Sequence, residues 1–151
     1  MSITITAERA DTPDAIQLID ELEGVLAPLY PSESRHGYSV EKLLKQDVAF
    51  FVLRVDGDPA GCGGVQFYEE GYAELKRMYV RPAYRGRGLS KRILNHLAAY
   101  SAQHEYTILR LETGIYQAEA IGLYEGMGFY KVPPFGDYHE DPNSLFYEKK
   151  L

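Results

Sequence analysis

Cysteine and long hydrophobic runs are nearly absent from this 151-residue sequence, and each shortage excludes a class of protein. With Cys62 alone, the chain can form no internal disulfide, which favours a reducing, cytoplasmic setting over a secreted one. No apolar run approaches the about 18 residues of a membrane span, and residues 1–9 lack the basic and apolar segments of a secretion signal. We therefore expect a cytoplasmic protein without a membrane partner.

Positive charge is also scarce, because 16 lysines and arginines are outnumbered by 22 acidic residues, for a net charge of −6 at pH 7. Proteins that bind nucleic acids normally carry a basic field, so we expect no nucleic-acid partner, although a local basic pocket for one small anion is compatible with this charge. The histidines lack the spacing of metal ligands, and we expect no metal site. They are His36, His96, His104 and His139.

The pattern of hydrophobic residues, which make up 45% of the sequence, predicts one domain over residues 1–151. Alternation and apolar runs predict strands at residues 2–8, 48–55, 59–68, 72–80, 107–113, 129–132 and 145–150. Helical spacing and start signals predict helices at 13–24, 40–46, 89–104 and 117–127. An antiparallel meander followed by alternating strands and helices predicts an α/β fold, with a mixed, mostly antiparallel sheet of about seven strands and helices on both faces.

The most informative segment, residues 78–91, consists of a strand end, a glycine-containing loop and a helix start. Gly86 and Gly88 let the backbone approach a ligand closely, and the first amides of a helix favour a phosphate. Arg85, Arg87 and Lys91 add cations beside it. The spacing of a Walker loop is absent, and a dinucleotide motif would need a glycine at Lys91, so both alternatives fit poorly. A connector without a ligand is the plainer alternative.

This loop resembles the acyl-CoA pyrophosphate loop of the GCN5-related N-acetyltransferases (the GNAT superfamily). The family pattern Arg/Gln-x-x-Gly-x-Gly/Ala corresponds here to Arg85-Gly86-Arg87-Gly88-Leu89-Ser90, where Ser90 replaces the usual glycine or alanine. A second family signature is similar to Gln117-x-x-Ala120-x-x-Leu123-Tyr124-x-x-x-Gly128-Phe129, with Gln117 where asparagine is common. The two motifs occur in the family's order, and the resemblance is strongest from residue 73 to residue 129.

The resemblance implies acetyl-CoA as the acyl donor and a set of residues that bind it. The end of the strand before the loop would pair with the pantetheine arm, the loop amides would hold the pyrophosphate, and the strand around Glu112 and Thr113 would form the other lip of the site. The implied binding residues are Met78, Tyr79, Val80, Arg85, Gly86, Arg87, Gly88, Leu89, Ser90, Lys91, Thr113 and Gln117.

The resemblance also implies catalytic residues. Tyr124 would protonate the departing CoA thiolate. Glu74, 11 residues before Arg85, would deprotonate the amine, usually through water, and Glu112 is the alternative base. Strand alternation predicts that Glu74 shares a face with Met78 and Val80. Cys62 has no neighbouring histidine or helix start to activate it, so a packing role is favoured over an acyl-cysteine route.

The sequence therefore predicts an acetyl-CoA-dependent N-acetyltransferase in which a primary amine of a small molecule or peptide attacks the thioester directly. The alternatives are a non-catalytic CoA-binding regulatory module and an interaction domain without CoA affinity. The acceptor stays open among an amino acid, a polyamine, an antibiotic, a peptide N-terminus and a lysine side chain, with the net charge weakly favouring a cationic or neutral amine. Residues 26–38 and 133–138 are candidate walls of the acceptor site, and an exposed final strand favours a homodimer.

Overall fold

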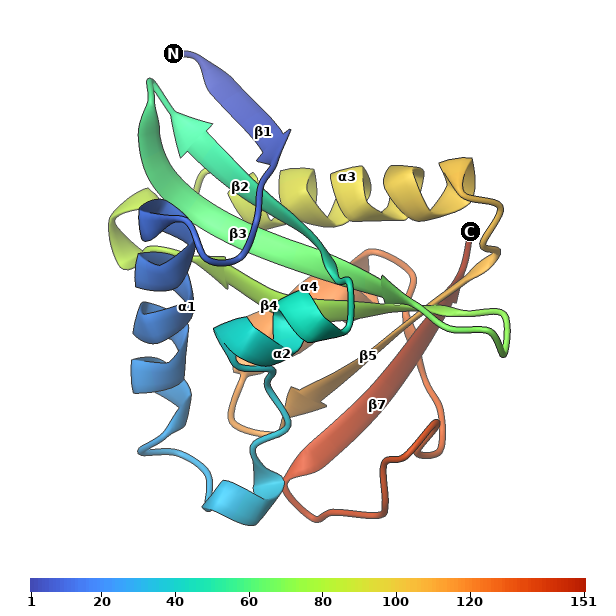
Figure 1. Cartoon of the computed structure of the whole chain (residues 1–151). Coiled ribbons are helices and arrows are strands. Elements are labelled where there is room, and N and C mark those ends of the chain that lie inside the picture. The colour runs from blue at the N-terminus through green and yellow to red at the C-terminus, as the bar shows by residue number, and fades with distance from the viewer.

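A seven-stranded sheet with the order β1-β2-β3-β4-β5-β7-β6 forms the centre of the protein in the computed structural model, which describes residues 1–151 (Figure 1). All neighbouring strands are antiparallel except β4 and β5, so the predicted mixed sheet is confirmed. The strands are β1 Ile3–Ala7, β2 Ala49–Val55, β3 Asp58–Phe67, β4 Ala73–Val80, β5 Ile108–Gly114, β6 Tyr130–Lys131 and β7 Ser144–Lys150. The helices are α1 Pro13–Leu26, α2 Val40–Lys45, α3 Leu89–Gln103 and α4 Ala118–Gly126, with short 3-10 turns η1 Ser32–Ser34 and η2 Pro82–Tyr84.

Local sequence accounts for the ends of these elements. Thr12 and Ser39 start α1 and α2 by accepting hydrogen bonds from backbone amides of the first turn, and Pro13 occupies the first position of α1. Asp56 and Gly57, with φ angles of +50° and +87°, make the tight turn between β2 and β3. Positive φ at both central residues is the geometry of the hairpin turn that an Asp-Gly pair predicts.

Helices cover both faces of the sheet, as predicted. α1 and α2 lie on one face, where Leu18 and Leu43 pack against Val52 and Cys62. α3 and α4 lie on the other face, where the larger hydrophobic cluster includes Leu97 and side chains of β2 to β5 and β7 (Figure 1). Burying each such aliphatic side chain stabilises the fold by about 1.5–3 kcal/mol, so the two clusters fix the sheet between its helices.

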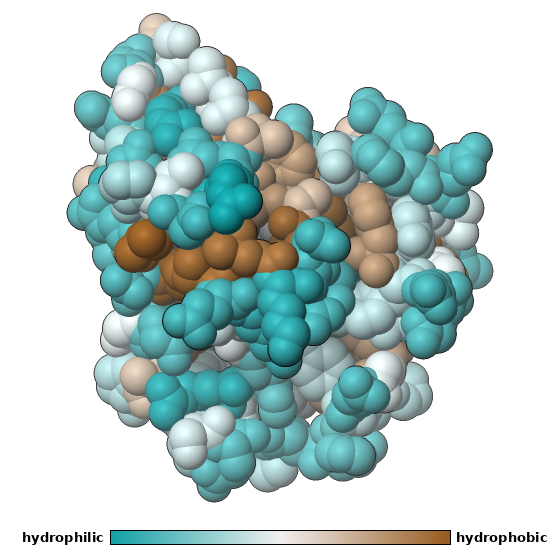
Figure 2. All heavy atoms as spheres, in the orientation of Figure 1, coloured by the Kyte–Doolittle hydropathy of each residue, from teal (hydrophilic) through white to brown (hydrophobic).

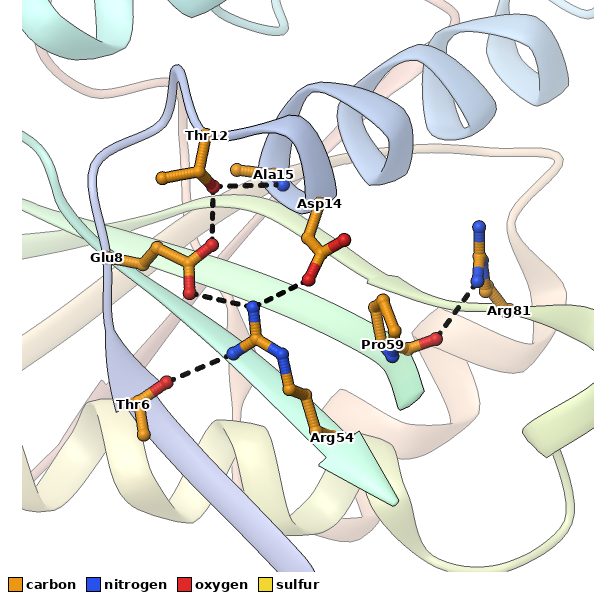
Figure 3. Close-up of polar contacts among 8 residues, drawn as sticks. All are labelled: Thr6, Glu8, Thr12, Asp14, Ala15, Arg54, Pro59 and Arg81. Carbon is orange, nitrogen blue, oxygen red and sulfur yellow. Dashed lines mark hydrogen bonds and ion pairs between the residues drawn. The ribbon is translucent and has the colours of Figure 1, made fainter. Parts of the chain in front are cut away.

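An arginine on β2 ties β1 and α1 to the sheet (Figure 3). Arg54 donates to Glu8 at 2.9 Å, to Asp14 at 2.8 Å and to Thr6 at 3.3 Å. Glu8 in turn accepts from the Thr12 hydroxyl. The hydrogen bond to Asp14 raises the pKa of Arg54 above its usual value, and this network fixes where α1 begins.

β4 and β5 separate soon after they meet. Only Ala73 and Glu74 of β4 pair with β5, opposite Leu109 and Arg110, and the two strands diverge beyond that point. The unpaired part of β4 therefore forms one lip of an opening in the middle of the sheet, as the family resemblance implied. β5 forms the other lip.

A bulge in β4 corrects the predicted orientation of Glu74. Two residues of β4, Arg77 and Met78, lie opposite a single residue of β3, and Arg77 has a φ of +52°. This extra residue shifts the alternation. Met78 and Val80 consequently pack into the cluster under α3, whereas Glu74 and Lys76 lie on the other side of the strand with Tyr38.

The final strand, β7, is not an edge strand, which corrects the basis for the predicted homodimer. β7 pairs with β5 along its whole length, and β6 pairs with its other side at Tyr147 and Glu148. The edges of the sheet are β1 and β6. The homodimer stays a prediction, without support from an exposed final strand.

Most of the surface in Figure 2 is hydrophilic, with a band of hydrophobic atoms next to α1 and α2. α2 also borders a groove of about 580 Å³, whose lining includes Leu44, Val48 and Phe51. None of the helices combines the length and the hydropathy needed to cross a membrane.

Candidate active site

Three connected cavities run from the glycine loop through the opening between β4 and β5. The loop-side cavity, of about 640 Å³, lies between the loop, the end of β4 and α4. The central cavity, of about 140 Å³, lies where β4 and β5 part, and the outer cavity, of about 390 Å³, continues from it. The residues common to the loop-side and central cavities are Leu22, Met78, Gln117, Ala120 and Tyr124.

The glycine loop leaves the start of α3 open to an anion. Gly88 begins the helix in the left-handed conformation, with a φ of +73° and no side-chain cap. The backbone amides of residues 89–91 have no backbone acceptor. Gly86, with a φ of +78°, and Gly88 both border empty space. The first-turn amides and the helix dipole therefore remain available to a phosphate group, which fits a CoA pyrophosphate.

The structure brings together all but one of the predicted CoA-binding residues. Arg85 is oriented by a 3.1 Å hydrogen bond from its Nε to the Val80 carbonyl oxygen. Arg87 is the exception, since it does not line the cavity and instead lies 5.4 Å above the Tyr84 ring. The residues lining the loop-side cavity include Met78, Tyr79, Val80, Arg85, Gly86, Gly88, Leu89, Ser90, Lys91 and Gln117, while Thr113 lines the central cavity.

α1 is fixed against the same end of β4. Glu21 accepts from Arg81 Nε at 3.0 Å and Nη2 at 2.7 Å, and from the Tyr79 hydroxyl at 3.1 Å. These bonds, with Arg81 first, lower the pKa of Glu21 below its usual value. Arg81 also donates to the Pro59 carbonyl (Figure 3), so the strand end before the loop is held from both sides.

Tyr124 lies where the loop-side and central cavities meet. Its side chain is 7% exposed and packs edge-on against Phe129. Burial, and to a lesser extent the nearby Glu112, raises the pKa of Tyr124 to about 12. The phenol therefore keeps its proton at neutral pH.

Glu74 is buried, at 2% exposure, and fully paired. Its carboxylate lies 3.0 Å from Lys76 Nζ and accepts a 2.6 Å hydrogen bond from the Tyr138 hydroxyl. Lys76 also lies 4.0 Å from the centre of the Tyr38 ring. Burial first, and then the Glu74 carboxylate, raise the pKa of Tyr138. These contacts hold the Glu74 carboxyl group in place.

Glu112 lines the central cavity from β5 and has no cationic partner. Burial, followed by the charge of Glu74, raises its pKa from 4.5 to about 7. A carboxylate with this pKa accepts a proton far more readily than an ordinary surface glutamate. Of the two glutamates considered from the sequence, Glu112 has the properties of a base at neutral pH.

Two arginines line the central cavity, Arg35 from the predicted wall of residues 26–38 and Arg77, which the sequence did not indicate. Arg77 donates to the Tyr38 carbonyl at 2.8 Å and to Glu23 at 2.7 Å, and Arg35 donates to Glu23 at 3.3 Å. The Arg77 guanidinium also packs directly on Gly37, where no side chain would fit. The bulge turns Arg77 toward α1, and a bulge in β4 has no signal in the sequence pattern.

The irregular segments predicted as acceptor-site walls do line the central cavity. Residues 26–38 contribute Leu26, Tyr30 and residues 34–38, and the loop before β7 contributes Tyr138. Tyr30 reaches across the opening, where its hydroxyl accepts from the Tyr116 amide at 2.9 Å.

Cys62 is fully buried, and its Sγ donates to the Arg77 carbonyl oxygen at 3.3 Å. Burial raises the pKa of the thiol to about 12. The thiolate needed for an acyl-cysteine route is therefore negligible at neutral pH, and Cys62 has a packing role.

Two strands that part beside an open helix start form the architecture of an acyl-CoA N-acyltransferase. Comparison with protein families gives the same result, because the model of the "Acetyltransferase (GNAT) family" matches residues 16–129. The chain belongs to this family of acyl-CoA-dependent transferases.

Individual relatives agree with the family. The chain is 42% identical over 151 residues, covering 99% of both chains, to a protein named IAA acetyltransferase from Azospirillum brasilense. It is 35% identical to a Klebsiella pneumoniae protein described as an acyl-CoA N-acyltransferase, with a TM-score of 0.84 over 99% of this chain and 97% of that one. The PaiA N-acetyltransferase of Thermoplasma acidophilum, solved with coenzyme A, shares the fold with a TM-score of 0.79 over the full length of both chains, at 22% identity.

Proposed function

We propose that this chain transfers the acetyl group of acetyl-CoA to the primary amine of a small molecule or peptide, without a covalent enzyme intermediate. The observation that carries this proposal is the meeting of two cavities at Tyr124, one beside the glycine loop and one in the opening of the sheet. A thioester lying along β4 is then reached by an amine from the central cavity. Neither metal nor nucleic acid takes part.

In the proposed reaction, the amine nitrogen forms a bond to the carbonyl carbon of the thioester, and the bond from that carbon to sulfur breaks. Tyr124 gives its proton to the departing sulfur. A cavity carboxylate accepts the proton that the amine loses, directly or through water. Glu112 is the proposed acceptor of this proton, because its pKa of about 7 suits the task, whereas Glu74 is paired with Lys76 and Tyr138.

Calorimetric titration of acetyl-CoA and CoA tests the donor site first. Wild type should bind both in the micromolar range, and the double variant Arg85→Glu, Gly88→Asp should not bind. The matched control is Lys45→Glu, Gly24→Asp, which makes the same change of charge and the same glycine substitution at exposed positions of α2 and α1 and should bind like wild type. Absence of binding by wild type at millimolar CoA would leave only an interaction domain.

A thiol-release assay over a library of amines then separates an enzyme from a binding module. Release of CoA that depends on an amine and is lost in Tyr124→Phe supports the transferase. Binding of acetyl-CoA with no amine-dependent release would support the non-catalytic CoA-binding module instead.

Fractionation of cells tests the predicted cytoplasmic location, and sedimentation of the purified chain tests the predicted homodimer.

A further inference from the structure

Two guanidinium N–H groups of the central cavity have no hydrogen-bond acceptor. They are Nη1 of Arg77, whose side chain is only 5% exposed, and the buried Nε of Arg35. Both residues line the central cavity. A buried polar group without a partner is costly, and more so when it carries charge. Both guanidinium groups beside this cavity therefore have hydrogen-bonding capacity that the protein does not use.

The charges around these groups do not balance. Arg35 and Arg77 share a single carboxylate, that of Glu23, through one oxygen each. Glu23 is itself 43% exposed, so water weakens its effect. The other carboxylate, that of Glu74, is already paired with Lys76. It therefore does not provide an anion that balances the charge of either arginine.

The remaining charged groups of the cavity do not supply that anion. Glu112 is only partly ionised near pH 7, and His36 faces Asp141 at 3.7 Å. Apart from the partial charge of Glu112, one guanidinium charge therefore has no counterpart among the residues lining the cavity. The charged residues lining the central cavity are Glu23, Arg35, His36, Glu74, Lys76, Arg77 and Glu112.

We propose that the acceptor amine carries a carboxylate, and that this carboxylate binds to Arg35 and Arg77 in the central cavity. The inference deepens the proposed function and rests on it. A guanidinium binds a carboxylate through two parallel hydrogen bonds, which gives both charge and orientation. The substrate class is an amino acid or a similar amine-bearing acid.

This geometry separates the two ends of the acceptor. The carboxylate lies at the side of α1 and residues 35–37, and the amine is directed toward Glu112 and Tyr124 at the junction with the loop-side cavity. The local positive charge opposes the expectation from net charge, which favours a cationic or neutral amine. Local potential decides, because charges inside a cavity are screened less than those on the surface.

Matched acceptors test the proposal. Thiol release is measured with L-phenylalanine, L-leucine, L-lysine and L-glutamate, each against the amine left when its α-carboxylate is removed. The best carboxylate-bearing acceptor should have a kcat/KM at least about tenfold above that of its decarboxylated partner, as expected for a charged hydrogen-bonded contact. Decarboxylated amines that react equally well or better would overturn the inference.

Variants assign the discrimination to the arginines. In Arg35→Gln, the ratio of kcat/KM for the carboxylate-bearing acceptor to that for its decarboxylated partner should fall to about one, mainly because KM for the carboxylate-bearing acceptor rises. Arg77→Lys should also lower this ratio and serves as a second test. The matched control is Arg9→Gln, since Arg9 is exposed and paired only with Asp11. Acetyl-CoA affinity checks that each variant is folded. A ratio unchanged in both cavity variants would contradict the assignment.

Calorimetry on the CoA complex gives a readout without turnover. L-amino acids should bind to the wild-type complex and lose affinity in Arg35→Gln. If CoA binds and other amines react while no carboxylate-bearing acceptor binds, this inference fails alone. If CoA itself does not bind, the proposed function fails.

Discussion

Glu74 and Glu112 line one cavity from the adjacent strands β4 and β5, yet only Glu74 has a salt bridge, 3.0 Å from Lys76. The difference divides two similar side chains into two roles. Glu74 is held by its partners Lys76 and Tyr138. Its charge helps to raise the pKa of Glu112, after burial, to about 7.

A Glu112→Gln substitution should lower kcat/KM by about 10²–10³-fold, the size of a lost general base. In wild type, kcat/KM should rise with pH through an apparent pKa near 7, because the base must be deprotonated. The variant should lose that limb of the pH profile. Thiol release between pH 5.5 and 9 measures both, with the exposed Glu69→Gln as control. A limb that survives in Glu112→Gln and disappears in Glu74→Gln would assign the base to Glu74.

The same carboxyl makes stability depend on pH. The pKa of Glu112 is higher in the folded chain, at about 7, than its reference value of 4.5. Below both pKa values the Glu112 carboxyl is neutral in the folded and the unfolded state, so it does not lower the free energy of unfolding. As the pH rises through the interval between the two values, the folded state must hold a buried charge, and this lowers stability. Glu112→Gln removes that cost. Its stability relative to wild type should therefore increase by about 2–3 kcal/mol between pH 5 and pH 8, measured by urea unfolding without CoA.

Tyr124→Phe removes the proposed proton donor without changing the shape of the cavity. We expect kcat to fall by about 10²-fold with little change in the KM for acetyl-CoA. Because the pKa of Tyr124 is about 12, the wild-type rate should not decline below pH 10 through ionisation of this phenol. Tyr106→Phe, which alters a tyrosine stacked on Phe67 outside the cavities, is the control. A full rate in Tyr124→Phe would exclude the proposed role.

Replacing two glycines with alanine, one at a time, should change the stability of the fold in opposite directions. A Cβ on Gly61 would lie 2.6 Å from the backbone oxygen of Tyr79 and 3.1 Å from Ile93, so β3 and β4 would have to move. Gly61→Ala should destabilise the fold by about 1–3 kcal/mol, as overpacking does. Gly24 lies inside α1 with open space around it, and Gly24→Ala should stabilise by about 0.5–1 kcal/mol. Thermal unfolding of the two variants compares them directly.

The parts of the fold that rest on local rules were predictable from sequence. The Asp56-Gly57 turn, the start of α1 after Thr12 and the glycine loop before α3 all follow from residue types at fixed positions. The positions of Tyr124 and Gln117 beside the cavity follow from the family resemblance.

The parts that depend on distant segments were not predictable. The bulge at Arg77 places Glu74 on the face of β4 opposite to Met78 and Val80. The period-two alternation of the sequence does not indicate this bulge. Tyr138, which binds Glu74, comes from 64 residues further along the chain. The pKa of Glu112 likewise depends on how deeply the assembled fold buries it.

The separation of β4 from β5 also has a mechanical consequence. Only Ala73 and Glu74 connect the four N-terminal strands to the remaining three through backbone pairing. The sheet thus has two halves joined by one short stretch of strand pairing, and a change in the width of the opening would break no other strand pair. A long ligand bound between the two halves of the sheet would restrict their relative movement. Amide exchange along the unpaired parts of β4 and β5 should therefore slow when acetyl-CoA is added.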